Sequence, residues 1–257
     1  MIVPLAARVV EHDATVYRHT WRGTMLVSFI SPIFFLTAMG IGLGALVNRT
    51  SGGVDGVAYL AFLAPGLLVT TAMQTAMAEC TYPVLGKVLW ARTYEAMLNT
   101  PLRVRDLLIG DLSWVAVRMF LVSIAFFVVM AAFGLARNPA SILAIPAAAL
   151  TGMAFATPIF AYSVTQIHDS GFPALQRFVI MPLFLFGGAF FPITRLPVIL
   201  QWVAQLTPLY HGVVLSRGLT LGRLGPSEAA LHAAVLLVYI AIGTVAAGVG
   251  LARRMSK

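Results

Sequence analysis

Six long apolar runs constrain this chain more than any other feature. They extend roughly over Met25–Leu46, Val57–Ala78, Leu112–Phe133, Ile142–Val164, Phe172–Phe191 and Ala229–Leu251. A helix needs about 20 apolar residues to cross the hydrocarbon core of a bilayer. Lipid offers the backbone no hydrogen-bond partners, and the runs lack the alternating polarity of barrel strands, so we expect an all-α membrane protein with six transmembrane helices. Pro173 and Pro182 interrupt the fifth run, which makes it the weakest of the six.

The composition supports a lipid environment. Of the 257 residues, 60% are hydrophobic and 10% are charged, whereas soluble domains carry about 25% charged residues. These values exclude a disordered chain and an ordinary soluble domain. The net charge of +8 need not indicate nucleic acid, because basic residues of membrane proteins collect on cytoplasmic loops that face anionic lipid. We therefore expect membrane lipids, and no nucleic acid, among the partners.

The distribution of lysine and arginine predicts the orientation of the chain. Six spans place both termini on one side, and that side carries more basic residues than the other, mainly in the N-terminal segment, the second loop and the C-terminal tail. By the positive-inside rule, both termini are cytoplasmic. The single cysteine, Cys80, allows no intrachain disulfide and no cysteine-based zinc site, and it suits a bacterial inner membrane.

The N-terminal segment, residues 1–24, is expected to form a separate helix before the first span. On a helical projection of residues 5–22, most apolar side chains, including Tyr17 and Trp21, share one face, and most charged side chains share the other. Only Asp13 and Thr20 break the apolar face. The pattern predicts an amphipathic helix in the membrane interface, and a helix packed on a soluble partner is the alternative.

The longest cytoplasmic segment, residues 80–111, is expected to be structured. Residues 93–100 predict a short helix that ends at Pro101, and a second helix could begin between Arg103 and Leu108. Long structured segments of this kind are usually functional rather than simple connectors.

The outer segment, residues 192–228, contains a short apolar stretch, Val198–Leu206, between Pro197 and Pro208. This stretch is too short to cross a bilayer. Irregular backbone enters a membrane only where protein or a cavity covers it. We therefore predict a re-entrant or interfacial hairpin on the outer face, before the last span.

Several common motifs are missing from the sequence. There is no GxxxxGK[ST], HExxH or GxSxG, so the chain does not bind ATP through a P-loop, and we expect no catalytic residue and no metal site. Gly40–Ala45 fits a dinucleotide-binding pattern but lies inside a span, which excludes that role. Gly40 and Gly44 instead fit a GxxxG helix contact, with a glycine-rich helix of no contact role as the alternative.

The histidines outside the N-terminal segment suggest no catalytic constellation. His168 and Asp169 are predicted to lie in a polar turn, since neighbours in sequence rarely form a catalytic triad. His211 and His232 are expected to stand alone, at an interface or in a packed position.

A polar stripe runs along the second span. Thr71, Thr75 and Glu79 follow each other at helical spacing, with Gln74 beside them. Polar groups in membrane helices tend to face the bundle or a cavity, so the stripe is either a wall of a translocation path or a set of ordinary interhelical hydrogen bonds. Glu79 and Arg118 lie near the same end of neighbouring spans, and we predict that they pair.

Three stretches carry a resemblance to a known family. Residues 92–102 (RTYEAMLNTPL) with 108–110 (LIG), and residues 187–192 (GGAFFP) with Leu196-Pro197 and Pro208-Leu209, resemble the cytoplasmic and outer motifs of ABC type-2 exporter permeases. Residues 54–64 (VDGVAYLAFLA) are similar to the permeases of nodulation lipooligosaccharide exporters; daunorubicin-type drug exporters are a more distant likeness. The resemblance covers nearly the whole chain, from about Met25 to Arg254, and implies that residues 1–257 form a single transmembrane domain.

The resemblance implies partners and a mechanism. Such a permease pairs with a second copy, as a homodimer or heterodimer, and two ABC ATPase subunits that bind ATP and Mg²⁺ dock on its cytoplasmic side. Its coupling helix would contain Thr93, Tyr94, Glu95, Met97 and Asn99. The substrate class implied is an amphiphile, such as a lipid-linked saccharide, a glycolipid or a hydrophobic drug.

Two other classes of function stay open at this point. A secondary transporter driven by an ion gradient usually carries ionisable residues near the middle of the membrane, whereas the charges here cluster at span ends. A membrane enzyme acting on lipids would need a convergent set of His, Asp or Glu, whereas the acidic residues here are scattered.

Overall fold

The computed structural model describes residues 5–136 and 138–256, and their regular elements are helices apart from one isolated bridge between Val54 and Val57. Residues 1–4 of the predicted interface helix, Arg137 and Lys257 lie outside the described residues. The helices, in chain order, are α1 (Leu5–Thr37), the π-helical η1 (Ala38–Gly44), α2 (Ala45–Ser51), α3 (Tyr59–Cys80), α4 (Tyr82–Leu85), the π-helical η2 (Gly86–Trp90), α5 (Thr93–Leu98), α6 (Val104–Ala132), η3 (Pro139–Leu143), α7 (Ala144–Thr165), α8 (Gly171–Leu175), the π-helical η4 (Gln176–Ile180), α9 (Met181–Phe186), η5 (Ile193–Arg195), α10 (Val198–Gln205), α11 (Pro208–Leu221) and α12 (Pro226–Met255).

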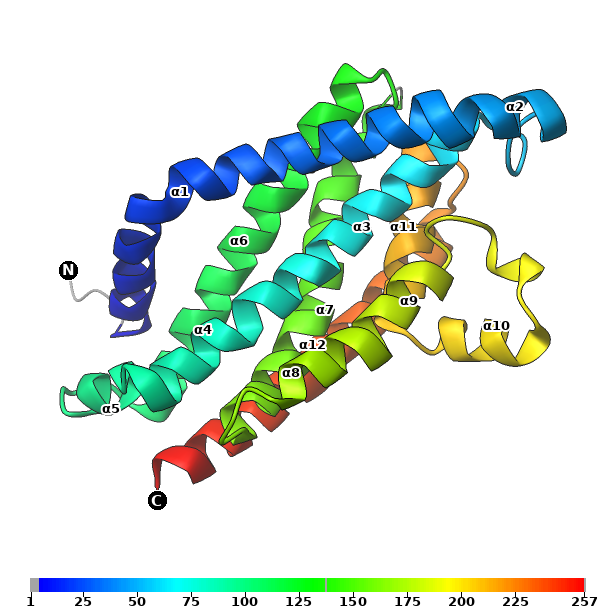
Figure 1. Ribbon diagram of the computed structural model, residues 1–257. Coiled ribbons are helices and arrows are strands. Elements are labelled where there is room, and N and C mark those ends of the chain that lie inside the picture. Colours follow the sequence, from blue (N-terminus) through cyan, green and yellow to red (C-terminus); the bar gives the residue numbers. More distant parts are fainter. Residues whose placement is uncertain (1–4, 137, 257) are drawn as a thin grey trace.

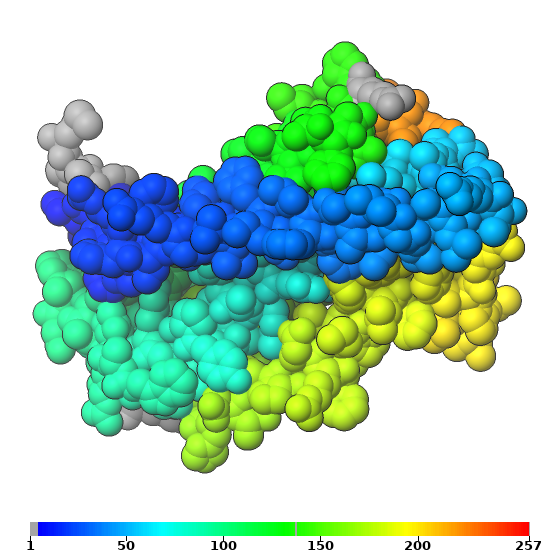
Figure 2. All heavy atoms as spheres, turned by 45° about the horizontal axis from the view of Figure 1, so that its top comes forward, coloured from blue at the N-terminus to red at the C-terminus, as the bar shows by residue number. Residues whose placement is uncertain are grey.

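The bundle is built around α7. Helices α3, α6, α11 and α12 all pack against it, and most side chains of α3 and α7 are buried. Helix α1 crosses the outside of this bundle, mainly against α6, and Figure 2 shows it as a continuous ridge along one face. Between Leu26 and Leu46 the outward side chains are mostly apolar, with Phe34 exposed by 72% and Ile41, in η1, by 75%. Such a face requires lipid or another apolar surface.

Five helical stretches are long and apolar enough to cross a membrane. They are Leu5–Ser51, Tyr59–Trp90, Val104–Ala132, Pro139–Thr165 and Pro226–Met255, and the pair formed by α10 and α11, bent by 83°, brings the number to six if it counts as one span. The all-helical membrane fold is thereby confirmed.

The predicted fifth span differs from the structure. The apolar helix there covers only Gly171–Phe186, shorter than the other spans, and the chain becomes irregular after Phe186. Gly187 ends the helix and Gly188 adopts a left-handed φ of 85°, a conformation that glycine reaches at no steric cost. The prediction of a span to Phe191 was therefore wrong at its C-terminal end.

The first predicted span is not separated from the N-terminal segment. Helix α1 runs from Leu5 to Thr37 without interruption and continues through η1 and α2 to Ser51. In Figure 1 its first turns stand at an angle to the remainder. No strong helix breaker lies between them, so the helix bends rather than stops. A position in the membrane interface stays a prediction.

The segment 80–111 is mostly helical. Helix α3 continues almost directly into α4 and η2, and α5 covers the predicted short helix. Helix α6 begins at Val104, inside the predicted interval, where Asp106 accepts a hydrogen bond from the backbone N–H of Arg103 at 3.0 Å.

The outer segment contains a helix that the sequence did not predict. Helix α11 packs against α3, α7 and α12, and one of its faces is buried. Polar side chains such as Ser216 and Arg217 interrupt its apolar sequence, so the helix does not stand out as an apolar run.

The two ends of the bundle are formed by different elements. The first turns of α1, the last turn of α12, α4, α5 and the turn before α8 lie at one end, the α5 end, and α10 lies toward the other, the α10 end (Figure 1).

Candidate functional site

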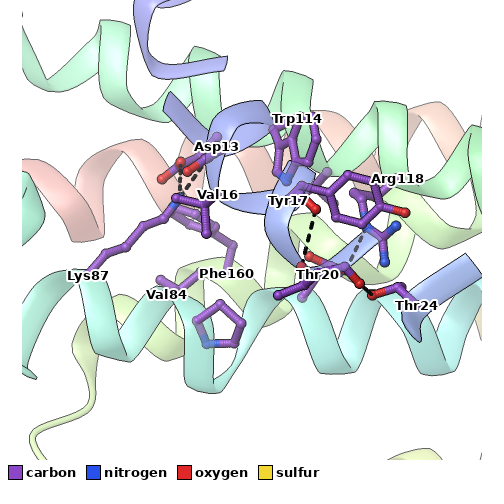
Figure 3. Close-up of a pocket in the computed structure, with 14 residues that line it drawn as sticks. Asp13, Val16, Tyr17, Thr20, Thr24, Val84, Lys87, Trp114, Arg118 and Phe160 are labelled. Carbon is purple, nitrogen blue, oxygen red and sulfur yellow. Dashed lines mark hydrogen bonds and ion pairs between the residues drawn. The ribbon is translucent and has the colours of Figure 1, made fainter. Parts of the chain in front are cut away.

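Helix α1 meets three consecutive elements, η2, α5 and α6, at the α5 end through one charged cluster. Lys87 of η2 donates hydrogen bonds from Nζ to Asp13 Oδ2 of α1 and to Asp111 Oδ1 of α6, each at 2.7 Å. The hydroxyl of Tyr94, in α5, donates to the other oxygen of Asp111. We call these residues, Asp13, Lys87, Tyr94 and Asp111, the α5 anchor; Figure 3 shows Lys87 reaching Asp13.

The α5 anchor is buried, which makes its pairing important. Asp13 and Asp111 are exposed by 6% and 2%, and Tyr94 is fully buried. Burial, together with the neighbouring Asp111 carboxylate, raises the pKa of the Tyr94 phenol well above its usual range, so the phenol keeps its proton and stays a donor. A buried charge without a partner costs several kcal/mol, roughly 3–5 in known cases, and here one lysine compensates two carboxylates.

Local backbone geometry places the anchor residues. Arg92 precedes α5 with a φ of 47°, a left-handed conformation that is costly for a residue other than glycine. On the α6 side, Gly110 lets α1 approach closely, because a Cβ there would lie 2.5 Å from Val9 Cβ. Glycine at this position is thus required for the contact that brings Asp13 to Asp111.

The predicted pair of Glu79 and Arg118 is confirmed. Arg118 Nε donates to Glu79 Oε1 at 2.8 Å, and the guanidinium lies over the ring of Tyr17 at 4.4 Å from its centroid. Tyr17 in turn contacts Trp114 edge to face, at 5.6 Å between centroids. Helix α1 is therefore held to α3 and α6 by a second cluster, one to two turns from the anchor.

The second cluster and three of the anchor residues, Asp13, Lys87 and Asp111, line one cavity, which we call the α1 cavity (Figure 3). Its volume is about 290 Å³. The lining residues come from α1, α3, α4, η2, α6 and α7: Asp13, Val16, Tyr17, Thr20, Thr24, Glu79, Pro83, Val84, Lys87, Asp111, Trp114, Val115, Arg118 and Phe160.

The polar stripe of the second span lines an adjoining cavity of about 560 Å³ between α1, α3 and α6. All four stripe residues, Thr71, Gln74, Thr75 and Glu79, face it. The threonine hydroxyls donate to carbonyls of their own helix, Thr71 to Leu67 at 2.8 Å and Thr75 to Thr71 at 2.9 Å. The alternative that these threonines bond to another helix is therefore not what the structure shows, and a role in a translocation path stays a prediction.

The residues predicted for the coupling helix differ in accessibility. Glu95 and Asn99 are exposed, Thr93 and Met97 are half-buried, and Tyr94 is buried. A surface for a docking protein at α5 would therefore be formed by Glu95 and Asn99 with part of Thr93. Tyr94 faces the interior and can act only through Asp111.

The glycines of the predicted helix contact lie against α3 of the same chain. A Cβ on Gly40 would lie 3.1 Å from Leu60 Cδ2, and one on Gly44 would lie 3.8 Å from Tyr59 Cδ1. Whether these glycines also contact a second copy stays a prediction.

His211 and His232 do not stand alone, so that expectation was wrong. Their Nδ1 atoms lie 2.8 Å apart between α11 and α12. His168 and Asp169 lie in a turn, as predicted. Across the residues that the structure describes, no group of three or more His, Cys, Asp or Glu side chains fits a metal ion.

Comparison with known proteins decides the family. The model of the ABC-2 type transporter family matches residues 10–221. The chain belongs to this family. It is 34% identical to Nodulation protein J of Rhizobium leguminosarum bv. viciae over 241 residues, which covers 92% of this chain and 91% of that protein. It is 37% identical to Nodulation protein J of Bradyrhizobium diazoefficiens over 224 residues, with 85% and 83% covered.

The chain is also similar to a more distant transport permease. The inner membrane transport permease YadH of Escherichia coli is 23% identical over 224 residues, with 86% of each chain covered. The chain is thus a multi-pass ABC-2 permease, the membrane subunit of an ABC transporter.

Sequence reasoning missed most of the α5 anchor of this ABC-2 permease. One signal was present, because Asp13 interrupts the apolar face of its helix and the structure buries that carboxylate. Lys87 and Asp111 carry no comparable signal, since their meeting depends on the packing of α1, η2 and α6. No local pattern in the sequence contains that information.

Proposed function

We propose that this permease is the membrane half of an ATP-driven exporter in a bacterial inner membrane, with both termini in the cytoplasm. It pairs with a second permease, and two ABC ATPase subunits that hold ATP and Mg²⁺ dock at its α5 end. Membership of the ABC-2 family supports this assembly. The absence of a P-loop motif from the sequence agrees with a nucleotide site on another chain.

One observation carries the proposal for coupling. Helix α5 offers exposed Glu95 and Asn99 on its outside, while Tyr94 ties its inside to Asp111 of α6. A docking protein that moves α5 would displace a hydrogen-bonded unit rather than a loose loop. Packed and hydrogen-bonded elements of this kind carry coupling between distant sites.

The anchor determines where the displacement goes. Lys87 links η2 to α1 and α6 at the same time, and Tyr94 links α5 to the same aspartate of α6. A movement of α5 is therefore passed to the two helices that border the α1 cavity and its neighbour. In this proposal, closure of the ATPases shifts α1 relative to α3 and changes the access of these cavities to the bilayer.

The substrate proposed is an amphiphile taken from the inner leaflet: a lipid-linked saccharide, a glycolipid or a hydrophobic drug. The cavities between α1 and α3 combine polar and apolar linings. Such a mixture suits a molecule with a headgroup and a tail. The bent pair of α10 and α11 is proposed as a re-entrant hairpin that forms the outer part of the path.

The test is assembly with an ABC ATPase, which is sought first in the reading frame next to this one. We expect the two to co-purify and the complex to hydrolyse ATP faster when substrate is present. Glu95→Arg is expected to weaken co-purification and ATP-driven transport, because it reverses the charge of an exposed residue on α5. Asp169→Arg, the same reversal in an exposed turn at the same end, is the control and should have little effect. Equal behaviour of both variants would remove α5 as the docking site.

A further inference from the structure

We propose that the α1 cavity binds the sugar headgroup of the amphiphile, and that it selects sugars without an acidic group. This inference rests on the proposed export function and makes its substrate more specific. It follows from the rings and charges that line one cavity between α1, α3 and α6 (Figure 3), and from a hydroxyl on one of those rings that is unpaired in the part of the chain that the structure describes.

The size and the aromatic lining of the α1 cavity fit a sugar ring. The cavity, at about 290 Å³, lies at the lower end of ligand sites, which span roughly 300–1,000 Å³, and a sugar ring is a small ligand. Tyr17 and Trp114 line it together. Arg118 already covers a face of Tyr17, so Trp114, which is half-buried, is the ring expected to stack on the apolar C–H face of a sugar. Aromatic side chains offer this combination of an apolar face and a polar edge.

The hydroxyl of Tyr17 lacks, within the described part of the chain, the hydrogen-bond partner that a buried polar group normally has. The Tyr17 hydroxyl is buried and has no hydrogen-bond partner among the residues that the structure describes. Buried polar groups are nearly always paired, so each exception calls for an explanation. The oxygen is closed to solvent in this structure, so the ligand must first displace the side chains that cover it. A sugar hydroxyl, which supplies both a donor and an acceptor, would then satisfy this phenol.

The charges of the cavity lining favour a neutral headgroup over a negatively charged one. Three carboxylates, Asp13, Glu79 and Asp111, face two cations, Lys87 and Arg118, and each cation is already paired with a carboxylate. The lining therefore carries an excess of negative charge. Carboxylates accept hydrogen bonds from hydroxyl groups. They repel a phosphate group bound in the same cavity, because like charges repel each other strongly over a few ångströms. A neutral sugar fits this lining and a phosphorylated headgroup does not.

The neighbouring cavities offer a place for the tail. The α1 cavity shares Thr24, Glu79 and Arg118 with the cavity of about 560 Å³ along α1, and that cavity is also lined by Val27 and Val122. Ser31, Pro32, Thr71 and Gln74 then continue into a third cavity. The three form one row beside α1, from the α5 end toward the middle of the bundle. An amphiphile in this row keeps its headgroup at the depth of the inner leaflet surface.

Three probes with the same tail separate the possibilities. Dodecyl maltoside, octaethylene glycol monododecyl ether and dodecylphosphocholine share a twelve-carbon tail and differ in headgroup. They are titrated, below their micelle concentrations and without ATP, onto the full permease–ATPase complex in lipid nanodiscs. The readout is the part of the tryptophan fluorescence change that is lost in Trp114→Phe. We expect saturable binding of the maltoside, at least about tenfold tighter than binding of the other two probes. A tenfold ratio corresponds to about 1.4 kcal/mol of binding free energy.

A matched pair of tyrosine variants tests the hydroxyl. Tyr17→Phe removes only the unpaired phenol oxygen and is expected to weaken maltoside binding about 3- to 10-fold, the effect of one hydrogen bond, with no change for the ether. Tyr82→Phe is the control, because Tyr82 lies at the same end but outside the cavity. Both variants remove a single oxygen, and unchanged melting temperatures verify folding.

The outcomes are distinct from those of the function test. Equal affinities for the three probes, tighter binding of dodecylphosphocholine, or equal behaviour of Tyr17→Phe and Tyr82→Phe would overturn the sugar site even if ATP-driven export occurs. Selective binding of the maltoside that depends on Tyr17 supports the site even if transport by this complex fails, because the assay needs no ATP.

Discussion

The two ends of the bundle hold their helices together by different chemistry. At the α5 end, side chains bind side chains: Lys87 joins two aspartates, and Arg118 pairs with Glu79. At the α10 end, Arg217 of α11 binds backbone instead. It donates to the carbonyl of Phe62 at 3.0 Å and to those of Gly188 and Ala189 at 2.9 and 3.1 Å.

The difference follows from the path of the chain. Near the α10 end the helix stops at Phe186, and the irregular residues that follow leave carbonyls without helical partners. In a membrane protein these carbonyls must be satisfied, and Arg217 does so. At the α5 end, the linked side chains come from helical segments, α1, η2, α5 and α6, whose backbone groups largely bond within the helix, so the side chains are free to link one segment to another. We infer that the α10 end is a fixed clamp and that the α5 end, built from exchangeable ion pairs, is the part that can move.

Lys87→Met should give the largest loss of stability. It leaves the buried carboxylates of Asp13 and Asp111 without their cation, and the expected cost is about 3–5 kcal/mol. Thermal and denaturant unfolding in detergent would measure it. Arg105→Met, which removes an exposed cation nearby, is the control, and an equally small effect of both would show that the α5 anchor is not a stabilising junction.

Arg217→Met should follow, at about 3 kcal/mol, because several buried carbonyls each lose a donor. Arg223→Met is the matched control, since the exposed Arg223 also binds a carbonyl, that of Asp55, at 2.7 Å. We expect that variant to lose less than about 1 kcal/mol. Proteolysis of the segment 187–197 should accelerate in Arg217→Met alone; unchanged protection would contradict the clamp.

Tyr94→Phe should have an intermediate effect, about 1.5–3 kcal/mol, because it removes a donor to a buried carboxylate. The pKa of Tyr94 is raised in the folded state, so folding favours the protonated phenol. This stabilisation is present below the unfolded pKa of about 10 and is lost as the pH rises further. Unfolding midpoints measured from pH 8 to 11 should fall less steeply for Tyr94→Phe than for the wild type; parallel curves would count against a buried phenol.

Arg92→Gly should have the smallest effect and the opposite sign. Glycine relieves the left-handed φ of 47° before α5, and we expect a gain of about 1 kcal/mol, set by a strain of roughly 1–2 kcal/mol and the greater entropy of glycine. Arg103→Gly, at a residue with φ of −105°, should instead destabilise. Stabilisation by both substitutions would mean that strain at Arg92 is not the cause.

Much of the fold is visible in the sequence, and the reasons for the failures are physical. The apolar runs gave the long helices because lipid imposes a length that no soluble core requires. The pair of Glu79 and Arg118 was predictable because both lie near the same end of neighbouring spans. Helix α11 was missed because its polar side chains face protein rather than lipid.

The site was less visible than the fold. The polar stripe on α3 predicted which residues face a cavity, since helical spacing puts them on one face. The α5 anchor depends on the close approach of α1 to α6 at Gly110, which no spacing along the chain reveals. Asp13 was the one trace of it, as a charge on an apolar face.

Transport in vesicles is the most direct test of the central claim, that this permease is moved by a separate ATPase. The purified permease is reconstituted with and without the partner ATPase, and the movement of a fluorescent acylated sugar is followed. We predict movement only when ATPase and ATP are both present, and no response to a proton or sodium gradient. Movement by the permease alone, or movement driven by an ion gradient, would contradict the claim.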